Sequence, residues 1–135
     1  MHPDETFSIS LRIWHPVMPA QEMIEAVGLE PRISQSVGLR RATPAGEFLD
    51  GFYRASYCNF RLVMKAPGRF TEALAPLLDQ LGGNRDIFRQ IALTGGRTEL
   101  YVGVFVEGDS GFTLAIDDIS RMAELSLELS VEVYP

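Results

Sequence analysis

The stretch Phe7-Ser8-Ile9-Ser10-Leu11-Arg12-Ile13 decides the fold class, because apolar and polar residues alternate through it without a break. A period of two places every second side chain on the same face, so the stretch predicts a strand with one buried face. Pro16 ends this strand, and Pro19 fits the first turn of a helix that runs to Val27, with Gly28 as its C-terminal cap. The chain therefore opens as strand, tight loop and helix.

Further strands and helices follow along the chain. Their spacing predicts strands over 52–64 (with a bulge near Cys58), 100–106 and 127–134. It also predicts a helix over 71–81 with Thr71 as its N-cap, a second helix with Asn84 as its N-cap, and a third from Asp117 or Asp118 to Ala123. Turn residues at 108–111 predict that 112–116 pairs back on the preceding strand as a hairpin. Between Leu29 and Gly51, glycine and proline predict a long irregular loop with a short strand or edge segment inside 31–41.

This order of elements predicts an α+β fold. We expect a mostly antiparallel sheet with helices packed on one face, for which an elaborated ferredoxin-like unit is the nearest standard layout. The 135 residues, 46% hydrophobic and 22% charged, are sufficient for one hydrophobic core, so a single domain over 1–135 is expected. The same composition excludes a disordered chain, a disulfide-stapled mini-protein and a membrane-spanning protein.

Charge is distributed unevenly along the chain. The net charge is −6, which argues against nucleic acid as a partner, because phosphate backbones are bound by basic surfaces. From Gly28 to Arg69, however, seven basic residues oppose three acidic ones, whereas from Glu99 to Pro135 eight acidic residues are opposed by Arg121 alone. We expect the basic middle to contact another protein, or the acidic tail of a second copy of this chain.

Cysteine usage and hydropathy indicate the compartment. Cys58 is the only cysteine, so no internal disulfide forms, which fits a reducing cytoplasm. Residues 1–10 lack the pattern of a signal peptide, and no apolar run approaches the ~20 residues of a membrane-spanning helix. We therefore expect a cytoplasmic protein with no membrane association.

Eleven of the twelve basic residues are arginine, which indicates either the codon bias of a GC-rich genome or recognition of carboxylates and phosphates.

Several segments together resemble one protein family over nearly the whole chain. They are the opening strand, the helix that ends in Val27-Gly28-Leu29-Glu30-Pro31, the segment from Leu49 to Cys58, and the short helix after Asp117 that runs into a strand ending Val131-Glu132-Val133-Tyr134. In their order they resemble the uncharacterised bacterial proteins of the domain of unknown function 4279 family. The family commonly has tryptophan where this chain has Cys58. The resemblance implies an α+β fold and a bacterial origin, and it implies no established activity.

Catalytic and metal-binding motifs are weak in this sequence. His15 and Cys58 are the only pair that could serve as base and nucleophile, but cysteine also packs as a small apolar residue. His2 and His15 lack the spacing of metal ligands, and we expect no metal and no cofactor. Three other groups have ordinary structural explanations: Thr94-Gly95-Gly96-Arg97-Thr98 as a helix C-cap, Asp117-Asp118 as a helix N-cap, and Glu107 with Asp109 as turn residues.

The strongest candidate site is a segment rich in arginine and tyrosine. We expect its binding residues to be Arg32, Arg40, Arg41, Tyr53, Arg54 and Tyr57, with Trp14 a further candidate for the same surface. The alternative is a solvated loop whose arginines pair with the acidic C-terminal strand. Two functions follow from these residues. The first is a non-enzymatic protein-binding module, in one version an immunity-type protein that blocks a toxin, and the second is a binder or enzyme for a small anionic ligand in an arginine-lined cleft.

Overall fold

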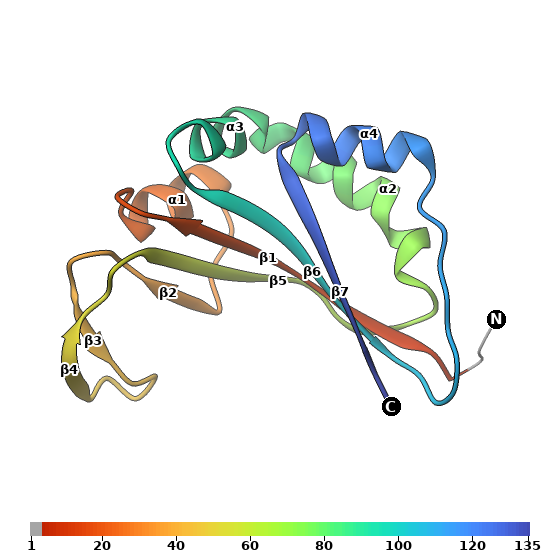
Figure 1. The fold of residues 1–135 in the computed structure, drawn as a ribbon, viewed down its shortest axis with the longest axis horizontal. Helices are drawn as coiled ribbons and strands as arrows, with labels where there is room; N and C mark the ends of the chain where they lie inside the picture. The colour runs from red at the N-terminus through yellow and green to blue at the C-terminus, as the bar shows by residue number, and fades with distance from the viewer. Residues whose placement is uncertain (1–3) are drawn as a thin grey trace.

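In the computed structural model, which describes residues 4–135, five strands form one sheet in the order β2-β5-β1-β6-β7 (Figure 1). The strands are β1 (Thr6–His15), β2 (Ile33–Gln35), β5 (Ser56–Pro67), β6 (Arg97–Phe105) and β7 (Leu127–Tyr134). Every neighbouring pair is antiparallel except β6 and β7, which are parallel. The expected α+β class and the mostly antiparallel sheet are confirmed.

The helices cover one face of this sheet, as Figure 1 shows. They are α1 (Ala20–Val27), α2 (Phe70–Leu81), the 3₁₀ turn η1 (Gly82–Asn84), α3 (Arg85–Leu93) and α4 (Ile116–Glu124). The alternation in β1 accounts for the layering, because Phe7, Ile9, Leu11 and Ile13 are buried against the helices, whereas the residues between them lie on the other face. Within residues 4–135, no helix has the length and hydrophobicity that crossing a bilayer requires.

The connections explain why the layout is ferredoxin-like. β1 and β2 are joined through α1 and have β5 between them, and β5 and β6 are joined through α2 and α3 and have β1 between them. Two such split β-α-β units, interlocked in one sheet, define the ferredoxin-like arrangement. This chain elaborates the arrangement in three places, by adding α3, by appending α4 and β7, and by inserting a small hairpin between β2 and β5.

The inserted hairpin consists of β3 (Arg40–Ala42) and β4 (Phe48–Phe52), which form their own two-stranded sheet. In Figure 1 it extends from the sheet edge on the side opposite the helices. Gly46, at φ +89°, supplies the left-handed turn residue. The Tyr53 hydroxyl accepts a hydrogen bond from the Ala42 amide and donates one to the Ala42 carbonyl, which holds the base of the hairpin. The expected loop over 29–51 is therefore largely ordered as β2, β3 and β4.

Three local predictions are wrong. Residues 112–116 form no strand, because β1 and β7 already occupy both edges of β6, and Phe112 instead packs edge-on against Phe70 in α2. The irregularity of β5 lies opposite the segment from Phe7 to Ser10 and includes Lys65 at φ +40°, rather than near Cys58.

The third wrong prediction concerns helix capping. Thr71 lies inside α2, the aspartates at 117 and 118 lie in the first turn of α4, and none of these helices has a side-chain N-cap bond. Asn84 instead donates to the carbonyls of Ala26 and Val27, so it caps the C-terminus of α1.

Gly96 is the position where backbone and side chains approach most closely. A Cβ atom there would lie 2.5 Å from the Trp14 carbonyl oxygen and 2.7 Å from atoms of both His15 and Ile91. These neighbours are a strand backbone, a buried ring and a core side chain, so none can move aside easily.

We therefore expect Gly96→Ala to lower the free energy of unfolding by about 2 kcal/mol or more, through overpacking. The matched control is Gly82→Ala, since a Cβ at Gly82 meets nothing within 4 Å and its φ is −57°. Gly82→Ala should leave stability unchanged or raise it by up to about 1 kcal/mol. Urea denaturation of both variants checks this, and equal stabilities would contradict the packing argument.

Candidate functional site

His15 lies at the end of β1 and is fully engaged in hydrogen bonds inside the protein. Its Nδ1 accepts from the backbone amides of Val17 and Met18, at 3.1 and 2.8 Å. The ring proton therefore lies on Nε2, which donates to the Thr94 hydroxyl at 2.7 Å, and that hydroxyl donates to the Gln90 carbonyl. Burial lowers the pKa of His15, and the charge of Glu22 opposes this only in part. His15 is thus a neutral structural residue that ties the end of β1 to the loop before α1 and to the end of α3.

Cys58 offers no nucleophile. It is completely buried on the helix-facing side of β5, and its Sγ contacts the Ala20 carbonyl at 3.9 Å. Burial raises the pKa of its thiol to about 11, so the thiolate is not populated at neutral pH. His15 has both ring nitrogens occupied by other partners, which leaves Cys58 without a base. The pair His15 and Cys58 therefore does not form a catalytic dyad in this structure.

A network of polar side chains lies across the face of the sheet that no helix covers. Glu99, only 4% exposed, accepts from Arg12 Nε at 2.8 Å and from the Ser130 hydroxyl at 2.9 Å. Arg97 lies 3.7 Å from the same carboxylate and 3.1 Å from Glu128. This network joins β1, β6 and β7 through their side chains.

Aromatic rings complete the cover of this face. The Arg12 guanidinium lies 4.2 Å from the centre of the Tyr101 ring and 5.2 Å from that of Trp14, which packs on Tyr57 at 5.2 Å. Arg97 lies 3.9 Å above Trp14. Trp14 and Tyr57 therefore belong to a packed layer that serves the sheet, which reduces the area they offer to a partner.

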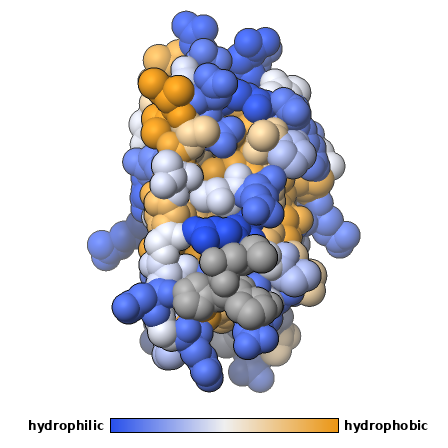
Figure 2. All heavy atoms as spheres, turned by 90° about the vertical axis from the view of Figure 1, so that its right-hand side faces the viewer, coloured by the Kyte–Doolittle hydropathy of each residue, from blue (hydrophilic) through white to orange (hydrophobic). Residues whose placement is uncertain are grey.

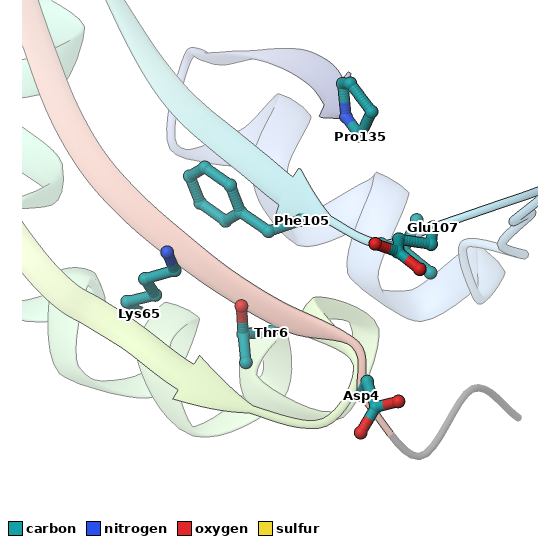
Figure 3. A pocket seen from close by; sticks show the side chains of 7 residues that line it. Asp4, Thr6, Lys65, Phe105, Glu107 and Pro135 are labelled. Atoms are coloured by element: carbon teal, nitrogen blue, oxygen red, sulfur yellow. The ribbon is translucent and has the colours of Figure 1, made fainter.

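At the end of this face near the C-terminus, Tyr134 stacks on Phe105 and its hydroxyl bonds to Glu132 and Tyr101, at 2.5 and 2.6 Å. The bond from Tyr134 lowers the pKa of Glu132, and the same bond raises the pKa of Tyr134. A hollow of about 500 Å³ lies beside this group (Figure 3). It combines an ammonium (Lys65, 4.7 Å from Phe105) with carboxylates (Asp4 and Glu107), and it contains none of the binding residues that the sequence predicts.

The hairpin carries the most exposed aromatic side chains. Phe48 is 66% and Phe52 65% exposed, and Leu39, just before β3, is also exposed. Arg40 is paired with Phe52 across the hairpin, and its guanidinium lies 4.6 Å from the centre of the Phe48 ring. We call Leu39, Arg40, Phe48 and Phe52 the hairpin surface.

Next to the hairpin surface lies a hollow of about 450 Å³ between β2 and β3. Three of the predicted binding residues, Arg32, Arg40 and Tyr53, line it together with small polar and apolar residues. No carboxylate, imidazole or thiol is among its lining residues, so it offers two guanidinium groups without an acid to neutralise them.

The other three predicted binding residues lie elsewhere. Arg41 donates to the Asp50 carbonyl at 3.2 Å and does not line this hollow. Arg54 lines a separate hollow of about 230 Å³ together with Trp14 and Arg97. Tyr57 lies in the packed layer over the uncovered face. The structure therefore brings together half of the predicted set and disperses the other half.

The alternative hypothesis, that these arginines pair with the acidic C-terminal strand of the same chain, is wrong. Within residues 4–135, the ion pairs are Arg12–Glu99, Arg97–Glu99, Arg97–Glu128 and Arg121–Asp79, and none involves an arginine from 32 to 54. The reason is topological, because β7 lies at the opposite edge of the sheet from the hairpin.

Sequence reasoning missed Phe48 and Phe52 as candidate binding residues. The signal was the turn sequence Thr43-Pro44-Ala45-Gly46, which lies between Arg40-Arg41-Ala42 and Phe48-Leu49. A turn with glycine between two such segments is typical of a hairpin.

The weaker candidate sites keep structural roles. Gly95, at φ +101°, and Gly96 follow the end of α3, and the Gly96 amide donates to the Ile91 carbonyl as a cap does. Asp117 and Asp118 face the positive end of the α4 dipole. Within the part of the chain that is described, no three His, Cys, Asp or Glu side chains come close enough to hold a metal ion. His2 lies outside the described residues.

The structure of His15 gives a pH prediction. The pKa of His15 is lower in the folded protein than the ordinary 6.5. Below about pH 6.5, His15 therefore binds a proton in the unfolded chain more readily than in the folded chain, which favours unfolding. The free energy of unfolding should fall between pH 7.5 and 5.5, by at most about 1.4 kcal/mol per pH unit from this site. His15→Gln should be less stable at pH 7.5 and should have a flatter profile. Identical slopes in urea titrations of the two proteins would contradict this assignment.

Comparisons with known proteins identify a family. Searches of the curated proteins and of the solved structures each found no match. The family profile described as a domain of unknown function (DUF4279) matches residues 5–135, which is essentially the whole chain. This match covers every strand and helix described above. The chain therefore belongs to the DUF4279 family of domains of unknown function.

Proposed function

We propose that this protein is a non-enzymatic binding module that contacts another protein through the hairpin surface. The observation that carries the proposal is the pair of exposed rings, Phe48 and Phe52, on a hairpin that extends away from the packed sheet. Aromatic residues and arginine are enriched at the centres of protein interfaces, and Arg40 accompanies both rings here.

The energetics support a partner at this surface. Burial of an exposed phenylalanine side chain stabilises a complex by about 1.5–3 kcal/mol, and two rings together contribute on the order of 3–6 kcal/mol. The fold gains little from these rings, because the hairpin forms a separate small sheet and its rings lie outside the hydrophobic core. An exposed apolar cluster of this kind is typical of an interaction site.

The charges around the hairpin indicate an acidic partner surface. Arg32, Arg40, Arg41 and Arg54 lie at this end of the molecule, and none of them pairs with a carboxylate within residues 4–135. Unpaired guanidinium groups beside apolar rings match a partner with carboxylates around an apolar pocket. Such charges raise the rate of association and fix the orientation of the partner.

We propose a bacterial and cytoplasmic setting for this module. Three observations support this setting: eleven of the twelve basic residues are arginine, the single cysteine is buried and free, and the proteins that the chain resembles are bacterial. One specific version is an immunity-type protein that blocks a toxin, for which a small acidic α+β domain is suited by analogy.

A second candidate function is the binding of a small anionic ligand in the hollow lined by Arg32, Arg40 and Tyr53. The absence of acidic lining residues favours it. The groups whose pKa is shifted, namely those of His15, Cys58, Glu132 and Tyr134, lie outside this hollow, so it presents no evident acid or base for catalysis. Protein binding is the stronger proposal, because a ligand in this hollow would not account for the exposure of Phe48 and Phe52, which do not line it.

The proposal predicts that a protein captured from source-cell lysate by the wild type is lost by Phe48→Ala/Phe52→Ala and by Arg40→Glu. With the purified partner, each phenylalanine truncation should weaken binding by about 30-fold, equivalent to about 2 kcal/mol. Met64→Ala is the matched control, since Met64 is equally exposed on β5 but lies outside the hairpin surface. It should bind like the wild type, and the melting temperature of every variant confirms folding.

Two outcomes would contradict the proposal. Equal capture by the wild type and the hairpin variants would remove the hairpin surface as the binding site. Thermal stabilisation of the wild type by phosphate or citrate, abolished by Arg32→Gln and unaffected by Phe48→Ala, would support the ligand hypothesis instead.

A further inference from the structure

The strand β7 forms an open edge of the sheet. It pairs with β6 over eight consecutive residues, from Leu127 to Tyr134, without a register shift, and no strand lies on its other side within residues 4–135. It contains neither proline nor glycine, and Val131 and Val133 favour extended backbone. Natural sheets usually protect an edge with a short strand, a bulge, a proline or charged side chains. β7 has no bulge and no proline, and its two charged residues, Glu128 and Glu132, lie on the uncovered face of the sheet.

The pairing with β6 shows which backbone groups of β7 remain free. The Val106 amide donates to the Tyr134 carbonyl, so Tyr134 faces β6. In a parallel ladder alternate residues direct their N–H and C=O groups to the same neighbour, so 128, 130 and 132 also face β6. The backbone groups of Leu129, Val131 and Val133 therefore point to the open edge.

A stripe of exposed apolar side chains lies next to this edge. On α4, Ile116 is 81% exposed and Ile119 is also exposed, and on β7 Val133 is 53% exposed. The ion pair between Arg121 and Asp79 fastens the other side of α4 to α2, so the two isoleucines face away from α2. Figure 2 looks onto this end of the molecule and shows hydrophobic atoms gathered near the top of its left flank, on the side where α4 lies.

We infer that β7 pairs antiparallel with β7 of a second copy of this chain, around a two-fold axis at Val131. This register places each Val131 opposite its counterpart and each Leu129 opposite Val133 of the second copy. All three residues have free backbone groups, so they form hydrogen-bonded pairs across the axis. β-branched and aliphatic cross-strand pairs of this kind stabilise a sheet.

The sequence of β7 is self-complementary in this register. On the uncovered face, Glu128 lies opposite Tyr134 and Glu132 lies opposite Ser130, so no two carboxylates of the copies are directly opposed. On the other face the pairs are apolar, and the exposed isoleucines of α4 lie on this same side of the sheet. A two-fold axis needs one surface patch that matches itself, and this edge provides it.

The dimer has a consequence for binding. It joins two sheets into one of ten strands, and it leaves both hairpins free, because each lies at the edge opposite β7. Two hairpin surfaces in one particle allow bivalent contact with a repeated or dimeric partner. The dimer does not depend on the proposed function, since the two surfaces share no residue.

Sedimentation equilibrium of the full chain tests the inference, in about 0.15 M salt so that repulsion between two chains of net charge −6 is screened. We expect a mass twice the 15.0 kDa of one chain. Val133→Lys and Ile119→Glu should each raise the dissociation constant of the dimer at least about tenfold. Leu93→Glu is the matched control, because Leu93 is similarly exposed but lies at the end of α3, and it should remain dimeric.

A cysteine crosslink tests the register separately. In a hydrogen-bonded antiparallel pair the Cα atoms are about 5.5 Å apart, which suits a disulfide. Val131→Cys should form a covalent dimer on mild oxidation, whereas Glu128→Cys should not, because it faces Tyr134 of the second copy. Cys58 is buried and does not compete. A wild-type monomer at high concentration, or a dimer that persists in both Val133→Lys and Ile119→Glu, would overturn the inference.

Discussion

The ion pair between Arg12 and Glu99 is the interaction on which the uncovered face of the sheet depends. Glu99 is almost inaccessible on a face that no helix shields, so its charge must be compensated by a fixed partner. Arg12 supplies that charge, and its own position is defined by the rings of Tyr101 and Trp14. Ser130 bonds to the same carboxylate from β7. One ionic contact therefore aligns β1, β6 and β7 and determines where the aromatic side chains can lie.

This constraint separates the residues that serve the fold from those available for function. His15 and Cys58 are occupied within the helix-covered side, and Trp14 and Tyr57 are occupied on the uncovered side. What remains exposed lies at the two edges of the sheet. The hairpin surface extends from the edge formed by β2, and β7 with the apolar stripe of α4 forms the other edge. A ferredoxin-like core with additions at both edges is thus a scaffold that presents two distinct surfaces.

Much of the fold could be predicted from the sequence, because the deciding signals are local. The alternation from Phe7 to Ile13 predicts β1 and its buried face, and the pattern after Leu127 predicts β7. The strand expected at 112–116 failed because pairing of β6 with β7 is a long-range property that no local turn signal reveals. The sequence predicts Asn84 as the cap of its own helix, but Asn84 caps α1 instead, because the tertiary arrangement brings the carbonyls of Ala26 and Val27 to it.

The candidate site could be predicted only in part, for a related reason. The sequence identifies arginine and tyrosine as residues of interfaces, and three of the six lie together around one hollow. The sequence does not show which aromatic residues pack against other side chains of the sheet. It therefore predicts Tyr57 as a binding residue, although Tyr57 packs on Trp14. Phe48 and Phe52 were missed because an irregular, glycine-rich segment hid a hairpin whose strands are only three and five residues long.

The side chains on the uncovered face stabilise the fold, whereas the exposed rings of the hairpin do not. Urea unfolding of Glu99→Ala and of Phe48→Ala/Phe52→Ala tests this difference without any partner. We predict that Glu99→Ala lowers the free energy of unfolding by about 2–4 kcal/mol, because it leaves the half-buried Arg12 without its carboxylate. The double variant should lose less than about 1 kcal/mol, as expected for exposed positions. A larger loss of unfolding free energy in the hairpin variant than in Glu99→Ala would contradict this assignment of roles.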